Sequence, residues 1–288
     1  MLKTAVLTDS GSGLSPQEAK EKGIYLIPLL VLIDGKSYND GQDISTLDVY
    51  QALSDKKYPK TSTPLYMNIE NLVRQIKEDG FDLIIATPLS AGLSSTHQSI
   101  RLAAQEVEID IEFVDVFSTC MIQKHISILA QDLINEGMTR NEIIEILNRV
   151  IKGANTLILP NDLDHLKVGG RLTPLAASLA EMFKIRPILQ LNASTKGKID
   201  VYAKVRTERK ALEEAIDTLH NSFKGKSCSI YIIHSHAAPR TELTKAMLIE
   251  KGYEPSRIYI NDIAAVIASH TGLDCLGIQF IETYQASI

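Results

Sequence analysis

Residues 4–21 read TAVLTDSGSGLSPQEAKE: an apolar run, a turn rich in glycine and hydroxyl groups, and then a charged segment. The run at residues 5–8 has the length and composition of a buried strand. Ser15, followed by Pro16 and by Glu18 three residues on, carries the capping-box signature of a helix start. A strand that passes through a short turn into a helix opens a crossover unit, so this stretch predicts an α/β protein with a parallel sheet.

The same alternation of short apolar runs and helix-period segments continues along most of the chain. Thr139 and Glu142 form a second capping box, followed by an apolar stripe at helical spacing. After residue 186, two runs follow each other with only a turn at residues 194–197 between them, which indicates a mixed sheet in the second half. The expected strands are residues 5–8, 25–33, 82–87, 111–114, 156–159, 187–191, 199–205, 229–234, 257–260 and 276–281.

Two helical segments in succession, residues 118–136 and 140–152, interrupt this alternation. They end just before Gly153-Ala154-Asn155, where we expect a domain boundary. A length of 288 residues also suits two domains of roughly 150 residues each. The sequence therefore predicts an N-terminal, mostly parallel α/β sandwich over residues 1–154 and a C-terminal, mixed-sheet α/β domain over residues 155–288.

Composition and charge exclude several classes of protein. Apolar side chains make up 44% of the chain, and 30 Lys and Arg against 35 Asp and Glu give a net charge of −5, which is ordinary for a soluble protein and argues against a nucleic-acid surface. The longest apolar run, Ile24 to Ile33, has ten residues and contains Pro28, whereas a membrane span needs about 20. The acidic Asp9 comes too early for a signal peptide, so a cytoplasmic protein is expected.

Cysteine and histidine spacing favours neither a disulfide framework nor a metal site. Cys120, Cys228 and Cys275 are odd in number and more than forty residues apart, so buried thiols are expected. The pair in His234-Ser235-His236 supplies at most two of the three or four ligands that a metal needs. We therefore predict no metal and no other cofactor.

Two hydroxyl-rich turns in the first half are candidates for anion binding, because the unpaired amides and partial positive charge of a helix start attract carboxylates and phosphates. One is Thr61-Ser62-Thr63-Pro64, and the other is Ser90-Ala91-Gly92-Leu93-Ser94-Ser95-Thr96. Helix capping explains each of them equally well, so a shared anion site and two separate caps both stay open. Gly11 and Gly13 do not complete a dinucleotide-binding fingerprint, since Pro16 stands in the place of the third glycine.

Two further features lie in the second half. Gly169-Gly170-Arg171 combines glycines that let a backbone approach a ligand closely with a guanidinium suited to a carboxylate or phosphate. A helix C-cap with an exposed arginine is the alternative. Ser269-His270-Thr271-Gly272 precedes the last expected strand. The basic group Lys204, Arg206, Arg209 and Lys210 has no interleaved aromatic residues, so its default meaning is a solvated face.

Gly92-Leu93-Ser94-Ser95-Thr96 also resembles the G-x-S-x-G nucleophile elbow, with His270 as the base of a serine hydrolase. Thr96 replaces the last glycine of that motif, and six residues separate Thr87 from Ser94 where an elbow needs an immediate turn. No oxyanion segment of the H-G-G-G type precedes Ser94. The pattern disfavours a hydrolase but keeps it as the enzyme alternative.

Taken in order, the motifs resemble the DegV family of bacterial fatty-acid-binding proteins, which includes the binding subunit of fatty acid kinase. Each match is short, but the ordered set covers nearly the whole chain. The matching elements are Thr8-Asp9-Ser10, Thr61-Ser62-Thr63-Pro64, Leu93-Ser94-Ser95-Thr96-His97-Gln98-Ser99, Leu166-Lys167-Val168-Gly169-Gly170-Arg171, Ile185-Arg186-Pro187-Ile188-Leu189, Lys204-Val205-Arg206-Thr207 and Ser269-His270-Thr271-Gly272.

The resemblance implies a two-domain carrier that buries the acyl chain of a long-chain fatty acid in a largely C-terminal tunnel and holds its carboxylate between the domains. Ser62 and Ser94 would bond the carboxylate with support from Thr61, and Arg171 and His270 would close the site. A separate ATP-dependent fatty acid kinase would then form the acyl phosphate.

On this interpretation the chain is not an enzyme, needs no cofactor and meets the membrane surface only transiently. Arg206 would engage the kinase or the transferred phosphate. The alternatives are the hydrolase with Ser94 and His270, and a sensor of another small anionic metabolite.

Some positions depart from the family pattern. Leu273-Asp274 replaces the usual proline and glycine, which alters either the geometry around His270 or only the loop beyond it. The other departures are Gly11, Gly13, Leu65, Ser95 and Val168. For the tunnel wall, the best candidate is the helix after Thr173, although plain core packing explains its apolar residues as well. Those residues are Leu175, Ala176, Ala177, Leu179, Ala180, Met182 and Phe183.

Overall fold

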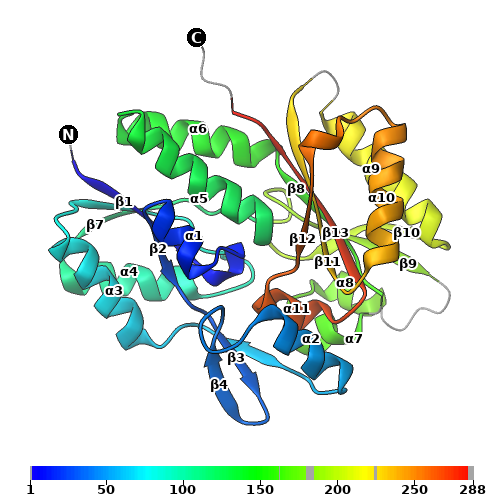
Figure 1. Cartoon of the computed structure of the whole chain (residues 1–288), viewed down its shortest axis with the longest axis horizontal. Helices are drawn as coiled ribbons and strands as arrows, with labels where there is room; N and C mark the ends of the chain where they lie inside the picture. Colours follow the sequence, from blue (N-terminus) through cyan, green and yellow to red (C-terminus); the bar gives the residue numbers. More distant parts are fainter. Residues whose placement is uncertain (1, 162, 180–184, 224–225, 285–288) are drawn as a thin grey trace.

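The computed structural model of the chain describes residues 2–161, 163–179, 185–223 and 226–284 (Figure 1). Its strands form three sheets, with the orders β2-β1-β6-β7, β10-β9-β8-β13-β11-β12 and β4-β3-β5. All strands of the first sheet lie before residue 154, and all strands of the second lie after it. The predicted two-domain α/β architecture, with a parallel N-terminal sheet and a mixed C-terminal sheet, is confirmed.

The N-terminal sheet is entirely parallel. Its strands are β1 (Thr4–Asp9), β2 (Ile24–Ile27), β6 (Leu83–Ala86) and β7 (Asp110–Phe113), and its helices include α1 (Pro16–Glu21), α3 (Tyr66–Glu78) and α4 (Thr96–Val107). The turn after β1 forms the 3-10 helix η1 (Ser10–Ser12), whose N-cap is Asp9. The capping box of Ser15 and Glu18 is present in full, as is that of Thr139 and Glu142.

The prediction of one strand over residues 25–33 is wrong. The chain changes sheet at Pro28, which lacks the amide hydrogen that a continuous ladder needs. After it, β3 (Leu30–Ile33) pairs antiparallel with β4 (Lys36–Asn39) and β5 (Lys60–Ser62), two strands that the sequence analysis missed. The helix α2 (Thr46–Ser54) connects β4 to β5. This small sheet carries Thr61 and Ser62 away from the N-terminal sheet.

The C-terminal sheet is mixed, as expected: β11 and β12 are parallel, and the other neighbours are antiparallel. Its core packs Phe280, Ile278 and Leu276 of the fully buried β13 against α9 and α10. The strands are β8 (Asn155–Leu159), β9 (Arg186–Leu191), β10 (Asp200–Val205), β11 (Cys228–Ser235), β12 (Ile258–Asp262) and β13 (Cys275–Glu282), and the helices are α9 (Glu208–Ser222), α10 (Ala238–Glu250) and the 3-10 helix η3 (Pro255–Arg257).

Two long helices, α5 (Cys120–Asn135) and α6 (Arg140–Gly153), lie between the two large sheets (Figure 1). Gln279 of β13 accepts hydrogen bonds from the amides of Met121 at 2.9 Å and Ile122 at 3.3 Å. A residue of the C-terminal sheet thus satisfies two unpaired amides at the start of α5. Gln123 of α5 donates to Asp9 Oδ1 of β1 at 2.9 Å. Buried hydrogen bonds therefore connect α5 to both large sheets and so join the two domains.

Three short helices complete the junction: α7 (Asp164–Gly169), α8 (Pro174–Ser178) and α11 (Ala265–Thr271). Of the predicted tunnel residues, Ala176 and Leu179 are buried and Leu175 is exposed, while Ala180, Met182 and Phe183 lie outside the described residues. The three cysteines are buried free thiols, as predicted. Among the described helices, none has the length and apolar character to cross a membrane.

Candidate functional site

A cavity of 320 Å³ lies where the two domains meet. The N-terminal domain lines it from β5 and from the loops before α3 and α4, and the C-terminal domain lines it from α7, α11 and the segments beside them. The lining residues include all five of the predicted ligand contacts, namely Thr61, Ser62, Ser94, Arg171 and His270. Thr61 and His270, which are 209 positions apart in the chain, thus line one space.

Strand pairing, not helix capping, positions Thr61 and Ser62. In the ladder between β3 and β5, Val31 is opposite Thr61 and Leu30 is opposite Ser62. The interpretation of this turn as a helix cap is wrong, because α3 begins only at Tyr66 and its N-cap, Leu65, makes no side-chain cap bond. The hydroxyl groups of this segment are therefore not consumed by a helix start.

Ser94 lies in the turn that leads into α4. Its Oγ accepts a hydrogen bond from the Thr96 amide at 3.2 Å and lies 2.8 Å from Thr96 Oγ1. The same turn packs on the β9–β10 hairpin, where Ser90 Oγ donates to the Gly197 carbonyl at 2.9 Å. A Cβ atom at Gly92 would collide with the Gly197 backbone, so only glycine permits this close approach.

His270 crosses the domain junction from the last turn of α11. Its Nε2 lies 2.6 Å from Thr61 Oγ1, within hydrogen-bond distance. Burial, together with the neighbouring Arg171 charge, lowers the pKa of His270 to about 4, so the imidazole is neutral near pH 7. The ring also presses against Gly169, where a Cβ atom would clash with Nδ1.

Arg171 follows the C-cap of α7. Gly170 adopts the left-handed conformation with φ of 69°, which confirms the predicted helix C-cap. The arginine is not merely a solvated end, because it lines the cavity and donates from Nη1 to the carbonyl of Gly169. Its guanidinium supplies a permanent positive charge beside a neutral imidazole and several hydroxyl groups.

The cavity is amphipathic. Polar groups from Thr61, Ser62, Ser94, Arg171 and His270 line it together with aliphatic side chains, which are Leu29, Leu89, Leu93, Leu166, Ile199, Val266 and Ile267. Convergent donors and one cation suit an acidic headgroup, and the aliphatic walls suit an apolar tail. In the described part of the chain, no cluster of three or more His, Cys, Asp and Glu residues has the arrangement of a metal site.

The sequence analysis missed what the Thr8-Asp9-Ser10 motif does for this cavity. Asp9 Oδ2 accepts from the Leu89 amide at 3.0 Å, and Ser10 Oγ accepts from the Leu29 amide at 3.0 Å. Leu29 and Leu89 both line the cavity. Burial raises the pKa of Asp9 to about 6, partly offset by the hydrogen bonds from Gln123, Leu89 and Gly11. The motif therefore fixes two wall residues, a role that needs the folded backbone to be seen.

A second cavity, of 290 Å³, shares Thr61, Arg171 and His270 with the first. Beyond these three it is lined by the loop that precedes β5 and by α7, including Lys60 and the stacked rings of Tyr58 and His165, whose centroids are 5.2 Å apart. Thr61, Arg171 and His270 thus line both cavities.

Two further predictions concern Arg206 and the Ser94–His270 pair of the hydrolase alternative. Arg206 is exposed beyond the end of β10 and is not among the residues that line the cavity. Ser94 and His270, the pair of the hydrolase alternative, bond Thr96 and Thr61 respectively. The histidine therefore does not engage the serine as a general base would.

A family model described as "Uncharacterised protein, DegV family" matches residues 3–283. The chain belongs to the DegV family. A DegV domain-containing protein of Streptococcus pyogenes serotype M1 is 33% identical over 273 residues, which cover 94% of this chain and 96% of the relative. A DegV domain-containing protein of Listeria innocua is also 33% identical, over 282 residues that cover 96% and 97% of the two chains.

Solved structures of DegV proteins share the whole fold. The fatty acid binding DegV family protein of Streptococcus agalactiae superposes with a TM-score of 0.91 at 29% identity, covering 99% of this chain and all of the other. DegV, a fatty acid binding protein from Bacillus subtilis, gives a TM-score of 0.85 at 26% identity, covering 98% and 100%. Both are described as binding fatty acids.

Proposed function

We propose that this DegV protein binds a long-chain fatty acid at the junction of its domains, residues 1–154 and 155–288, and presents the carboxylate to a partner. The amphipathic cavity of 320 Å³, with hydroxyl groups and Arg171 beside aliphatic walls, carries this proposal. The fatty acids bound by the DegV proteins of Streptococcus agalactiae and Bacillus subtilis support the same ligand class.

The tail supplies the affinity. Burying about 14 methylene groups at ~0.8 kcal/mol each gives on the order of 11 kcal/mol before the costs of association and ordering. The headgroup supplies the selectivity: Ser62 and Ser94 donate to the carboxylate, Thr61 orients His270, and Arg171 balances the charge. An ester or alcohol offers these donors no charged acceptor, so it forgoes a charge-assisted hydrogen bond worth about 1.5–3 kcal/mol.

The carboxylate acts as the acceptor for a separate ATP-dependent fatty acid kinase, which forms the acyl phosphate, so that this chain is the carrier and not the catalyst. The second cavity also borders Thr61, Arg171 and His270, which supports access to the headgroup without release of the tail. Arg206 contacts the kinase or the transferred phosphate from its exposed place after β10.

The substitution Arg206→Glu tests the partner contact. It is expected to leave fatty acid affinity unchanged and to slow acyl phosphate formation by a purified fatty acid kinase about tenfold or more, because an interface charge is reversed. Arg209→Glu, an exposed arginine three residues away, is the matched control. Equal rates for the wild type and both variants would remove Arg206 from the contact.

Collection of the ligand involves transient contact with a cytoplasmic membrane surface. Two exposed apolar side chains line the second cavity: Tyr58 is 60% exposed and Val168 is 70% exposed. Lys56 and Lys60 are exposed beside Tyr58 and suit anionic lipid headgroups.

Mass spectrometry of the denatured, purified protein tests the ligand. We expect one long-chain fatty acid per chain, and rebinding of that acid after its removal. A different anionic metabolite in the extract would favour the sensor alternative. Covalent labelling of Ser94 by a fluorophosphonate together with ester turnover would favour the hydrolase, and an empty protein that binds no fatty acid would overturn the proposal.

A further inference from the structure

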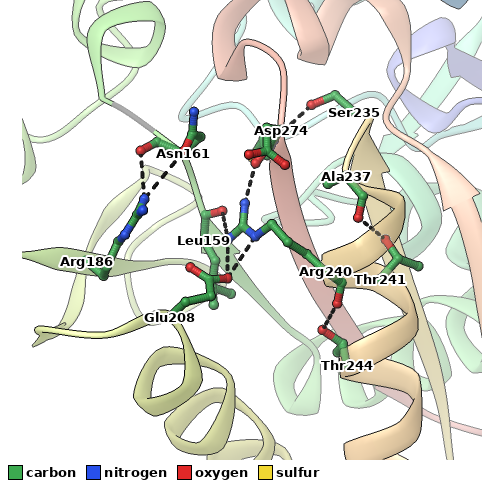
Figure 2. Close-up of polar contacts among 11 residues, drawn as sticks. Leu159, Asn161, Arg186, Glu208, Ser235, Ala237, Arg240, Thr241, Thr244 and Asp274 are labelled. Atoms are coloured by element: carbon green, nitrogen blue, oxygen red, sulfur yellow. Dashed lines mark hydrogen bonds and ion pairs between the residues drawn. The ribbon is translucent and has the colours of Figure 1, made fainter.

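Arg240, in the first turn of α10, joins three segments of the C-terminal domain (Figure 2). Its Nε donates to Glu208 Oε1 at 2.8 Å, its Nη2 donates to the Leu159 carbonyl at 3.0 Å, and its Nη1 donates to the Asp274 carbonyl. Glu208 begins α9, Leu159 ends β8, and Asp274 directly precedes β13. The arginine side chain is only 14% exposed, an environment in which charge-assisted hydrogen bonds are strong.

Asp274 is a residue that needs such a restraint. Its φ of 56° is left-handed, a conformation that costs free energy for any residue except glycine. Its amide donates to the Ser235 carbonyl at 2.6 Å. Figure 2 shows Asp274 held from two directions, by Ser235 of β11 and by Arg240. These bonds hold an aspartate in a conformation that glycine adopts at less cost.

Ser235 also bonds the segment that links His270 to Asp274. Ser235 Oγ donates to the Gly272 carbonyl at 2.7 Å, and the Gly272 amide donates to the Ala268 carbonyl at 2.9 Å. The connection from His270 to Asp274 is four residues long and is fixed at both ends. A shift of its far end would therefore move the imidazole relative to Thr61, whose Oγ1 lies 2.6 Å from Nε2.

We propose that Arg240 is a positioning residue for carboxylate recognition, which acts through the 271–274 connection to hold His270 against Thr61. The carboxylate part of this statement rests on the proposed function, whereas the placement of His270 does not.

The variant Arg240→Met tests this, since it keeps an unbranched apolar stem and removes all the donors. By NMR of the ligand-free protein, with His270→Asn used for assignment, the His270 ring signals are expected to shift and its pKa to rise toward the ordinary value. Affinity for a fatty acid is expected to fall about tenfold, with affinity for its methyl ester unchanged. The control is Arg209→Met: Arg209 is exposed and pairs with Glu213 on its own helix, so this variant is expected to change neither measurement.

Rescue separates positioning from a general loss of stability. Asp274→Gly removes the left-handed strain, so the double variant with Arg240→Met is expected to regain most of the lost acid affinity and the wild-type His270 signals. If the single variant does not fold, the double variant and Arg240→Lys carry the test.

A folded Arg240→Met protein with unchanged His270 titration and acid affinity would overturn the proposal, as would a double variant no better than the single one. Failure of the wild type to bind any fatty acid would instead contradict the proposed function, while the ligand-free NMR comparison would still decide the role of Arg240.

Discussion

At the residue scale, the hydrogen bond between Thr61 and His270 joins two domains through one hydroxyl group and one neutral ring. Because burial and Arg171 keep the imidazole uncharged, Arg171 provides the fixed positive charge of the cavity. A carboxylate that enters meets hydroxyl donors and this guanidinium, which is the one cationic group among the described residues that line the cavity. The sequence predicted these residue types, but not that Thr61 would bond the histidine.

The pH dependence of stability follows from the lowered pKa of His270. The folded pKa of about 4 lies below the ordinary 6.5, so the contribution is complete above pH 6.5 and is lost as the pH falls toward 4, by on the order of 3 kcal/mol. Urea unfolding at pH 7 and pH 4 measures it. In His270→Asn the decline is expected to be smaller by this amount, whereas Asp9 and His125, whose pKa values are also shifted, contribute equally to both proteins. Identical declines would contradict the assignment.

Ser94 is expected to affect recognition and not folding. Ser94→Ala removes the hydroxyl that lies 2.8 Å from Thr96 Oγ1 and accepts from the Thr96 amide, a single bond at the start of α4, so the fold is expected to persist. Binding of a fatty acid should weaken by roughly tenfold, and binding of the methyl ester should stay within twofold, as one charged hydrogen bond is lost. Calorimetric titration with both ligands checks this, and an equal loss for both would show a packing effect.

At the element scale, the predictable features were those with local signals. The helix starts at Ser15 and Thr139 could be predicted because a capping box is a pattern within four consecutive residues. The strand β5 reads Lys60-Thr61-Ser62, with no apolar alternation, and exists because β3 offers it a partner. Pro28, where the predicted strand over residues 25–33 is interrupted, is visible in the sequence. The change of sheet at this residue depends on the pairing of β3 with β5, which lies far along the chain.

The contact between the Ser94 turn and the β9–β10 hairpin can be tested by substitution. Gly92→Ala places a methyl group against the Gly197 carbonyl, and such backbone collisions cost about 1–3 kcal/mol. Gly153→Ala, where a Cβ atom meets nothing within 4 Å, is the matched control and is expected to be neutral or slightly stabilising. Urea midpoints measure both. A Gly92→Ala protein as stable as the control would mean that the turn yields without cost.

At the scale of the whole molecule, ordered motifs predicted more than propensities did. Four short segments far apart in sequence were expected at one site, and they line one cavity because α5 and β5 bring the domains together there. The boundary at residue 154 stays a prediction, since α6 ends there but packs on β13 of the other domain. The second cavity had no sequence signal, because it depends on how Tyr58 meets His165 across the junction.

Because the cavity draws on both domains, ligand binding is expected to stabilise the whole chain. For a delipidated protein, a fatty acid at one hundred times its Kd adds about 2.7 kcal/mol, which raises the Tm by several degrees in a protein of this size. The methyl ester should raise the Tm less at the same concentration. In Arg171→Met the acid is expected to lose this advantage, since the cation that faces the carboxylate is gone. Calorimetry measures the Tm increase of the wild type with the acid, the wild type with the ester, and Arg171→Met with the acid. An equal Tm increase for acid and ester in the wild type would place the selectivity outside this cavity.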